Sequence, residues 1–411
     1  MANYQRLEEQ EDRPSWLSLL TWLEWFALAV AVFLFVFYFS FQISHAKAPL
    51  DTELWGQFGD IIGGVVGTII AYISIRLLVK TLLAQLDANK KAEIVAKKTS
   101  YTSLTQQYHD KFNLLIKLYE EELAKFGDNN LQGQKYLRDR LRDMYTRSLE
   151  LTHANDSYAQ RLENGIKQFR GFYANNRHQS SVYFRLIYRI FNILYYSGLK
   201  NRDQLPYAKI FRCQLSEEEL FYLRYNAFTD NGKKMRQYIN SFNLLKHLPI
   251  MSLLEFCHWK NRFPGNTLAI SLIDTYFFTI RKRMIALCNE ESERYKWTTI
   301  CTDGHKYTTQ MGFSPKNKVA SIAVIKANQP STSELEEVLD NLTIDDIKEM
   351  IVDFSYELFV YSNFEEYMSV GNIELQPNTT QRAGTEIARV KVKDRNRFAL
   401  ILSHDQLDMP Q

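Results

Sequence analysis

Two short stretches place side chains that could do chemistry next to each other. The stretch TDGH, residues 302–305, brings Asp303 close to His305, and Cys257 directly precedes His258. An acid beside a histidine can serve acid–base catalysis, and a thiol beside a histidine can serve as a nucleophile. Adjacent residues on a helix point about 100° apart, however, which would separate Cys257 from His258. Because Asp-Gly is also a common turn sequence, we interpret both stretches as structural.

The remaining sequence gives little support for catalysis. It holds no Walker loop, no dinucleotide-binding glycine motif, no H-E-x-x-H and no G-x-S-x-G. The cysteines form no C-x-x-C pair and fit no zinc spacing, so we expect reduced, mostly buried thiols. These are Cys213, Cys257, Cys288 and Cys301. We therefore predict a protein that is not an enzyme, with no catalytic, cofactor-binding or metal-binding residues. An enzyme with an unfamiliar site, such as a nuclease, stays open as an alternative.

The elements that carry the clearest signal are two apolar runs near the N-terminus, residues 17–43 and 55–79. Each is long enough to cross a hydrocarbon core of about 30 Å, which needs about 20 residues. Trp16, Trp22 and Trp25 cluster at the start of the first run, as amphipathic rings do at a membrane interface. Because only a short polar link joins the runs, they should lie antiparallel as a transmembrane hairpin within residues 1–83.

The basic residues around the two runs predict the orientation. They are Arg6 and Arg13 before the first run, Lys47 in the link, and Arg76, Lys80, Lys90, Lys91, Lys97 and Lys98 at the end of the second run and beyond it. Excess positive charge stays inside, so the N-terminus and the C-terminal domain should be cytoplasmic. The expected location is the bacterial inner (cell) membrane, as a multi-pass protein. Residues 46–48 resemble a signal-peptide cleavage site, but the first run is too long for a signal peptide.

Small residues recur along one face of the second run at four-residue steps. This membrane packing or pore face consists of Gly56, Gly59, Asp60, Gly63, Gly64 and Gly67. Glycine lets helix backbones approach closely in lipid. The face could pack against the first span of the same chain, or it could build an oligomer or line a pore. An ionisable group such as Asp60 is costly against lipid, so it should face protein or water.

A second intramembrane feature is a predicted charge pair across the hairpin. Glu24 lies seven residues into the first span, and Arg76 lies three residues before the end of the second. At about 1.5 Å per residue their backbones differ in depth by about 6 Å, which an arginine side chain can cover. The alternative is that Glu24 stays hydrated near the interface while Arg76 extends toward water on its own.

Two local patterns predict helices in the part beyond the membrane. Ser216 with Glu219 predicts a capping box at the start of one helix. Another helix has one apolar face, formed by Tyr183, Phe184, Ile187, Tyr188, Phe191, Leu194 and Tyr195.

Beyond the membrane the pattern as a whole predicts a mainly α protein. Apolar spacing without Pro or Gly predicts a helical stalk at 84–126, followed by a helical cytosolic domain at 127–295. Residues 296–411 form a small C-terminal α+β region: strands around the turn near residue 303, two acidic helices within 333–369, and a hairpin at 388–403. The helical domain carries a basic block, residues 135–212, which could dock on the acidic helices or bind another anion.

Three segments together resemble the putative phage abortive infection protein family. They are WGQFGDIIGGVVGTIIAYISI at 55–75, YFRLIYRIFNILYY at 183–196 and QLSEEELFYLRYNAF at 214–228. The family pattern falls here on Phe58, Gly59, Asp60, Gly63, Gly64, Leu215, Ser216, Glu219, Leu220, Leu223, Tyr225 and Asn226. The resemblance covers about residues 15–245. The family that the chain resembles includes two-span membrane effectors associated with retrons.

The resemblance implies defence against bacteriophage by abortive infection, without a catalytic residue to carry over. The first hypothesis is a membrane-anchored toxin effector that self-associates and perturbs the inner membrane when triggered. The second is a membrane-tethered sensor or adaptor that binds a phage or host partner. The expected partners are the lipid bilayer, further copies of the chain and, if the protein is retron-encoded, a reverse transcriptase and its DNA product. Nucleic acid is not required by the sequence, and no cofactor is expected.

Overall fold

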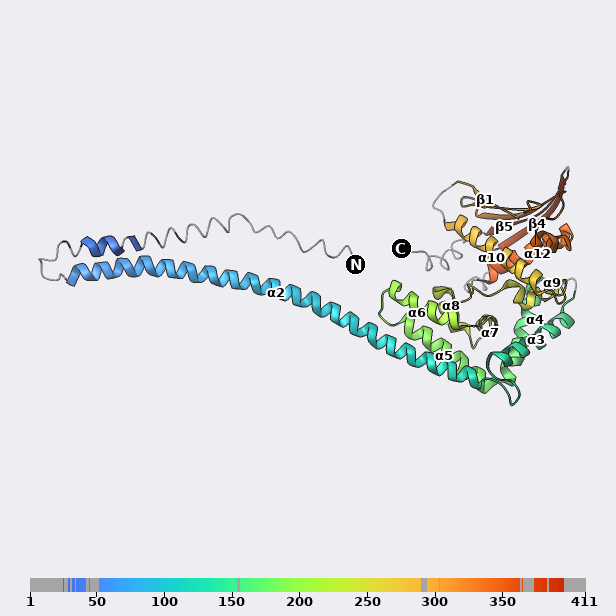
Figure 1. Cartoon of the computed structure of the whole chain (residues 1–411), viewed down its shortest axis with the longest axis horizontal. Coiled ribbons are helices and arrows are strands. Elements are labelled where there is room, and N and C mark those ends of the chain that lie inside the picture. The colour runs from blue at the N-terminus through green and yellow to red at the C-terminus, as the bar shows by residue number, and fades with distance from the viewer. Residues whose placement is uncertain are drawn as a thin grey trace. The chain divides into compact units, whose positions relative to one another are not determined.

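The computed structural model describes residues 25, 29, 32–33, 35–41, 44, 52–153, 156–289, 294–302, 304–362, 364, 373–382 and 384–394. The chain divides into two compact units, residues 1–103 and 104–411. The protein is mostly helical, with a small antiparallel sheet near its C-terminus (Figure 1). The mainly α fold with a C-terminal α+β region is therefore confirmed.

The longest element is α2, a helix of 74 residues that runs from Thr52 to Lys125. It contains the second predicted span and the predicted stalk in one continuous element, in keeping with the absence of Pro and with glycines confined to its first third. Most of the first predicted span, residues 17–43, lies outside the described residues, apart from a helical stretch that includes 35–41. The two-helix hairpin therefore stays a prediction.

The helical part of the second unit packs around α7, which is buried over most of its length. Its helices are α3 (Gly133–Leu151), α4 (Tyr158–Asn175), α5 (Arg177–Tyr195), α6 (Asn201–Gln214), α7 (Glu217–Phe228), α8 (Arg236–Phe242), α9 (Cys257–Lys260) and α10 (Thr267–Asn289). Ser216 caps α7 in a capping box with Glu219, as the sequence predicts. From Glu219 to Phe228 every residue of α7 is buried, which is typical of a helix at the centre of a domain.

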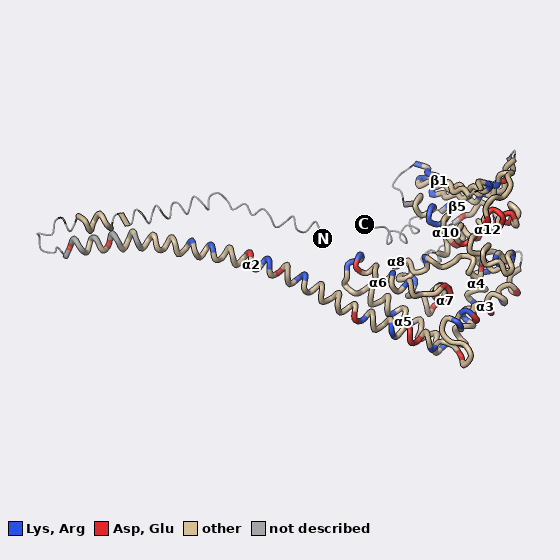
Figure 2. The backbone as a smooth tube through the Cα atoms, viewed as in Figure 1, with Lys and Arg blue, Asp and Glu red and all other residues tan. Residues whose placement is uncertain are grey.

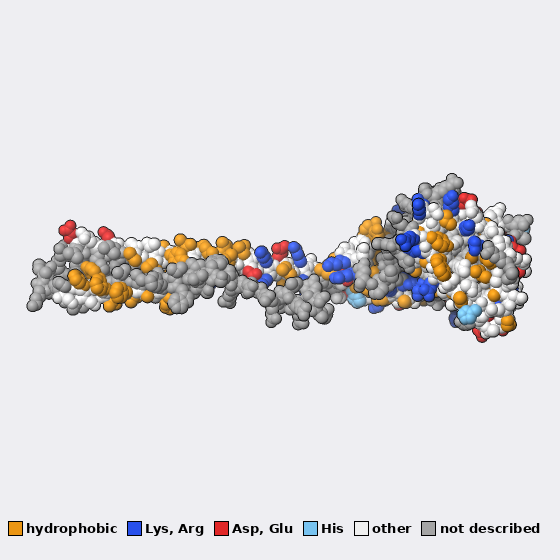
Figure 3. Space-filling view, turned by 90° about the horizontal axis from the view of Figure 1, so that it is seen from above, with side chains coloured by type: hydrophobic (Ala, Val, Ile, Leu, Met, Phe, Trp, Pro, Cys, Tyr) orange, Lys and Arg blue, Asp and Glu red, His pale blue; other side chains and the backbone are white. Residues whose placement is uncertain are grey.

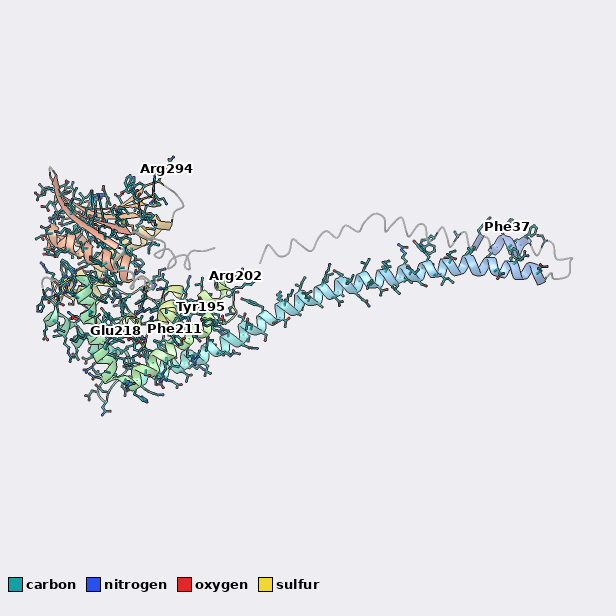
Figure 4. The ribbon with its side chains drawn as sticks, turned by 180° about the vertical axis from the view of Figure 1, so that it is seen from behind. Phe37, Tyr195, Arg202, Phe211, Glu218 and Arg294 are labelled. Carbon is teal, nitrogen blue, oxygen red and sulfur yellow. The ribbon has the colours of Figure 1, made fainter. Side chains whose placement is uncertain are left out.

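The predicted apolar face of α5 is largely confirmed. Tyr183, Ile187, Phe191 and Leu194 are all buried at helical spacing. Tyr195 was expected on the same face but is 43% exposed, because it lies in the last turn of α5 near the surface (Figure 4).

The C-terminal part is a five-stranded antiparallel sheet with the order β1-β2-β3-β5-β4. Its strands are β1 (Lys296–Cys301), β2 (Tyr307–Ser314), β3 (Val319–Ala327), β4 (Ile373–Arg382) and β5 (Thr385–Asp394). The acidic helices α11 (Glu334–Asp340) and α12 (Ile344–Tyr356) follow β3, and a π-helical turn, Glu357–Tyr361, continues α12. Helices α10 and α12 pack against the same face of the sheet (Figure 1).

The hairpin predicted at 388–403 is wrong. Residues 388–394 belong to β5, whose partner β4 precedes it, with Arg382 paired to Thr385. The chain turns at Gly384, whose φ of +77° is available to glycine without strain. The alternating pattern of β5 was recognised in the sequence, but the strand was paired with the segment that follows it instead of the one before.

Candidate functional site

The first candidate site is the exposed apolar surface of α2. Within the described residues, the stretch Gly63–Lys125 includes an apolar segment that is long enough to cross a membrane and is not buried against the protein. Its exposed large apolar side chains are Val65, Ile70, Tyr72, Ile75, Leu77, Leu78, Val79, Leu82, Leu83 and Leu86. Orange side chains gather along part of this helix (Figure 3). An apolar surface of this extent is expected to contact lipid or another protein.

Two threonine hydroxyl groups on this helix donate hydrogen bonds to backbone carbonyl oxygens of the preceding turn. Thr68 donates to the carbonyl oxygen of Gly64 at 2.5 Å, and Thr81 donates to that of Leu77. Such bonds to the preceding turn leave a hydroxyl without need of water. The polar side chains of the segment are therefore compatible with a hydrocarbon environment.

The predicted glycine face lies open. Gly56, Gly59, Gly63, Gly64 and Gly67 are exposed, and a methyl group built on any of them meets no described atom within 4 Å. Asp60 on the same face is exposed as well. Among the described residues, none occupies the space beside these glycines.

Of the charge pair predicted within the membrane, only one residue lies in the described part of the chain. Arg76 lies on α2 and is partly exposed. Glu24 lies outside the described residues. Their pairing across a hairpin stays a prediction.

The second candidate site is a buried charge network centred on Arg224 of α7. Its guanidinium donates from Nη1 to Glu255 Oε1 at 3.1 Å and from Nη2 to Glu357 Oε2 at 2.7 Å. Tyr225 donates to the other oxygen of Glu255 at 2.5 Å, and Tyr158 donates to Glu357 at 2.7 Å. Burial disfavours the charge on Arg224, but the two carboxylates outweigh it and raise the pKa of the guanidinium. The network joins α7 to the turn before α9 and to the end of α12.

A second ion pair links the helical part to the acidic helices. Arg161 of α4 pairs with Asp353 of α12, and Trp259 donates from its indole nitrogen to the other oxygen of Asp353 at 2.8 Å. Arg161 comes from the basic block at 135–212. The other contacts of the acidic helices with described bases use residues outside that block, as in the pair of Arg262 with Asp346. The docking of the whole basic block on the acidic helices is therefore not what the structure shows.

Glu219 is a further buried acid, and it attaches α7 to two other helices. One carboxylate oxygen accepts from the hydroxyls of Tyr119 on α2 and Tyr183 on α5, the latter at 2.7 Å. The other oxygen accepts from the backbone N–H of Ser216 at 3.0 Å and from Gln134 at 3.3 Å. Burial, followed by the negative charge of Glu219, raises the pKa of both tyrosines, so they remain proton donors at neutral pH.

Cys257 and His258 do not form a reactive pair. Cys257 is buried, burial raises the pKa of its thiol, and its sulfur lies 3.9 Å from Thr152 Oγ1. A nucleophilic thiol requires the opposite shift. His258 instead points to Asp353, 3.5 Å from Nε2 to Oδ2. His305 is exposed at a φ of +60°, as expected for a turn, and Asp303 lies outside the described residues.

The cysteines divide evenly between surface and interior. Cys257 and Cys288 are buried, whereas Cys213 and Cys301 are exposed, and all four are free thiols. Within the described part of the chain, no group of three or more His, Cys, Asp or Glu residues is placed to hold a metal ion.

One open pocket of about 440 Å³ lies between α3, α9 and the start of α10. Its walls carry Arg138, Arg142, Lys260 and Glu217 beside apolar side chains such as Phe263. Lys260 lies over the ring of Tyr145, 4.2 Å from Nζ to the ring centre, and burial lowers the pKa of its ammonium group. Charges of both signs line the pocket, which gives it no single preference for a ligand.

Comparison with protein families supports the resemblance seen in the sequence. The family described as putative phage abortive infection protein matches residues 177–253. The matched segment runs from α5 through α8 and includes Glu219 and Arg224, the residues at the centre of two buried networks. Comparison with curated proteins and with solved structures finds no match.

Proposed function

We propose that this protein is a membrane-anchored anti-phage effector that acts by abortive infection and perturbs the inner membrane when it is triggered. The family match supports a role in abortive infection. The observation that carries the membrane mechanism is the exposed apolar stretch of α2 with its open glycine face. The proposed mechanism assigns this face to contact between copies of the chain, whereas an adaptor would need it only for packing within its own hairpin.

In the proposed arrangement, two spans at 17–43 and 55–79 form a hairpin with both ends in the cytoplasm. The basic residues that follow the second span hold α2 on that side, because positive charge resists transfer across the membrane. The glycine face of one copy packs against another copy, and the assembled spans open a path for ions. A reverse transcriptase and its DNA product are the expected partners if the gene lies in a retron.

The experiment is to follow membrane potential in bacteria that express the protein while they are infected by a phage it protects against. A potential-sensitive dye should report depolarisation before phage release, and cells without the protein should keep their potential until lysis. Protection without depolarisation would contradict the membrane mechanism. That result would favour the adaptor or, if host or phage nucleic acid is degraded first, a nuclease.

A further inference from the structure

The sheet has one covered face and one open face. On β5 the side chains of Ala388, Val390 and Val392 are fully buried against the helices. Because neighbouring residues of a strand point to opposite faces, Arg389, Lys391 and Lys393 lie on the other side. The part of this outer face that Figure 3 leaves visible shows several blue side chains and few red ones.

The three cations form a column along β5. Successive members are two residues apart, which corresponds to roughly 6.5 Å along a strand. None of them has an ion pair with a described residue, and both lysines are exposed. The register places Glu374 of β4 opposite Lys393, while uncharged Gln376 and Asn378 lie opposite the other two. Among the described residues of this column and its β4 neighbours, positive charge therefore prevails.

Small residues lie in the middle of the outer face. The register places Gly312 of β2 beside Ser321 of β3, and Ala323 beside Arg389 of β5. A methyl group built on Gly312 would lie 1.9 Å from the hydroxyl oxygen of Tyr295, so this tyrosine lies across the outer side of β2. The side chain of Tyr295 is therefore placed on the outer face, where it could meet a ligand that crosses the strands.

Two aromatic side chains border this surface at the β1 end. Trp297 is 67% exposed and Tyr295 is 61% exposed. The register places Trp297 opposite Gly312, on the outer face. From β5 to β1 there are three strand spacings, about 14 Å in all, which a few nucleotides of an extended strand can bridge.

We propose that this outer face of the sheet binds single-stranded nucleic acid, with phosphates along Arg389, Lys391 and Lys393 and bases stacked on Trp297 and Tyr295. Unpaired cations beside exposed aromatic rings are the combination by which proteins hold single strands. A lipid surface would also attract the cations, but it favours inserted apolar side chains. This face instead presents polar groups such as Thr299, Gln310 and Asn378, which can hydrogen-bond to bases. The proposal does not depend on the membrane mechanism of the preceding subsection.

The test uses the full-length protein in nanodiscs of neutral lipid and fluorescent oligonucleotides of about 12 nucleotides, a length within the usual range for one such surface. Anisotropy titrations with single-stranded DNA and RNA should show saturable binding that weakens as salt is raised. The variant Arg389→Gln/Lys391→Gln/Lys393→Gln should bind at least tenfold more weakly. Its salt dependence should fall by about 2 in the slope of log K against log salt, since each phosphate contact contributes about 0.7.

Two further variants separate stacking from charge. Trp297→Ala should weaken binding about tenfold with an unchanged salt slope, whereas Trp297→Phe should retain most of the affinity. The matched control is Lys111→Gln/Lys117→Gln/Lys167→Gln, which removes the same charge from exposed lysines outside the sheet. It should change the affinity by less than a factor of about two to three. Circular dichroism of each variant verifies that the fold is intact.

Three results would overturn the proposal. The first is the absence of oligonucleotide binding by the parent protein at low salt. The second is an equal loss of affinity in the control variant. The third is that phosphatidylglycerol vesicles, and not oligonucleotides, bind the parent and lose binding in the β5 variant, which would make the face a lipid-contacting surface.

Discussion

Arg224 donates a hydrogen bond from Nη2 to Oε2 of Glu357, 2.7 Å away, although 133 positions separate the two residues in the sequence. The side chain of Arg224 is 1% exposed and that of Glu357 is 10% exposed. The bond joins the segment that matches the family to the C-terminal part, which lies beyond the match. The bond therefore couples α7 to the turn that continues α12 through a buried charge.

Replacing Arg224 should strongly destabilise the protein. Arg224→Met would leave Glu255 and Glu357 buried without a cation, a change that typically costs roughly 3–5 kcal/mol. Denaturant unfolding of the detergent-solubilised full-length protein would measure the loss. The control is Arg138→Met, which breaks the pair with Glu218 at a side chain 63% exposed and should cost less than about 1 kcal/mol. Similar losses of stability in the two variants would show that the buried network contributes no more to the free energy of unfolding than an exposed ion pair.

Glu219→Gln should loosen the attachment of α7 to its neighbours. One carboxylate oxygen accepts from the tyrosines and the other from Ser216 N–H. A glutamine offers only one acceptor oxygen, and its amide group would face a donor. We expect a loss of about 1–3 kcal/mol in the free energy of unfolding, the usual cost of a buried donor without an acceptor. Glu217→Gln, at an exposed position of the same helix, should change it by less than about 0.5 kcal/mol.

How far the sequence predicts this fold depends on how far apart the interacting residues lie. The capping box of Ser216 and Glu219 spans three residues and was predicted correctly from their spacing alone. Arg224 was passed over, although a single arginine inside the apolar run ELFYLRYNAF signals a buried charge that needs partners. Its partners could not be found, because no local pattern connects positions 224, 255 and 357.

In the sheet, too, the partners of a segment could not be found from local sequence patterns. Strands β1, β2, β3 and β5 were recognised in the sequence, whereas β4 was missed. The pairing of β5 with β4 depends on which segment lies next to it in space. The cations on the outer face become visible only once the register decides which side of β5 is buried. The sequence showed Arg389, Lys391 and Lys393 as alternating charges, without showing that they share an open surface.

The stability of the protein should depend on the protonation of Asp274. Burial raises the pKa of its carboxyl group to about 6. The hydrogen bond that the carboxylate accepts from the backbone N–H of Met251 at 2.8 Å lowers the pKa, but by less. A carboxyl whose pKa is higher in the folded than in the unfolded state stabilises the fold when protonated. This contribution is complete below about pH 4 and is lost as the pH rises through about 6, with a total of at most about 3 kcal/mol.

Asp274→Asn should therefore be more stable than the parent at pH 7.5, with a gain that shrinks as the pH is lowered toward 4. Unfolding curves of both proteins across this pH range provide the measurement. Asp230→Asn removes an exposed carboxylate and serves as the control. A gain that is independent of pH would mean that the asparagine stabilises the site for a reason other than the lost charge.

The predicted pair of Glu24 and Arg76 can be tested with a charge swap. Glu24→Arg and Arg76→Glu should each reduce accumulation of the protein in the membrane, because each places like charges close together in lipid. The double variant should recover accumulation, measured in membrane fractions by immunoblot. If it accumulates no better than the worse single variant, the two residues are not partners.

The glycine face should be required for protection but not for membrane insertion. A leucine at Gly63 or Gly67 would fill the space that the structure leaves open, so another helix could no longer approach closely. Gly63→Leu and Gly67→Leu should therefore lower protection against phage to the level of cells without the protein, while the variants remain in the membrane fraction. Gly63→Ala adds only one methyl group and should retain part of the activity. The matched control is Val65→Leu, which places the same side chain on the opposite side of α2 at an exposed position. Full protection by the glycine-to-leucine variants, or an equal loss in Val65→Leu, would show that this face has no function of its own.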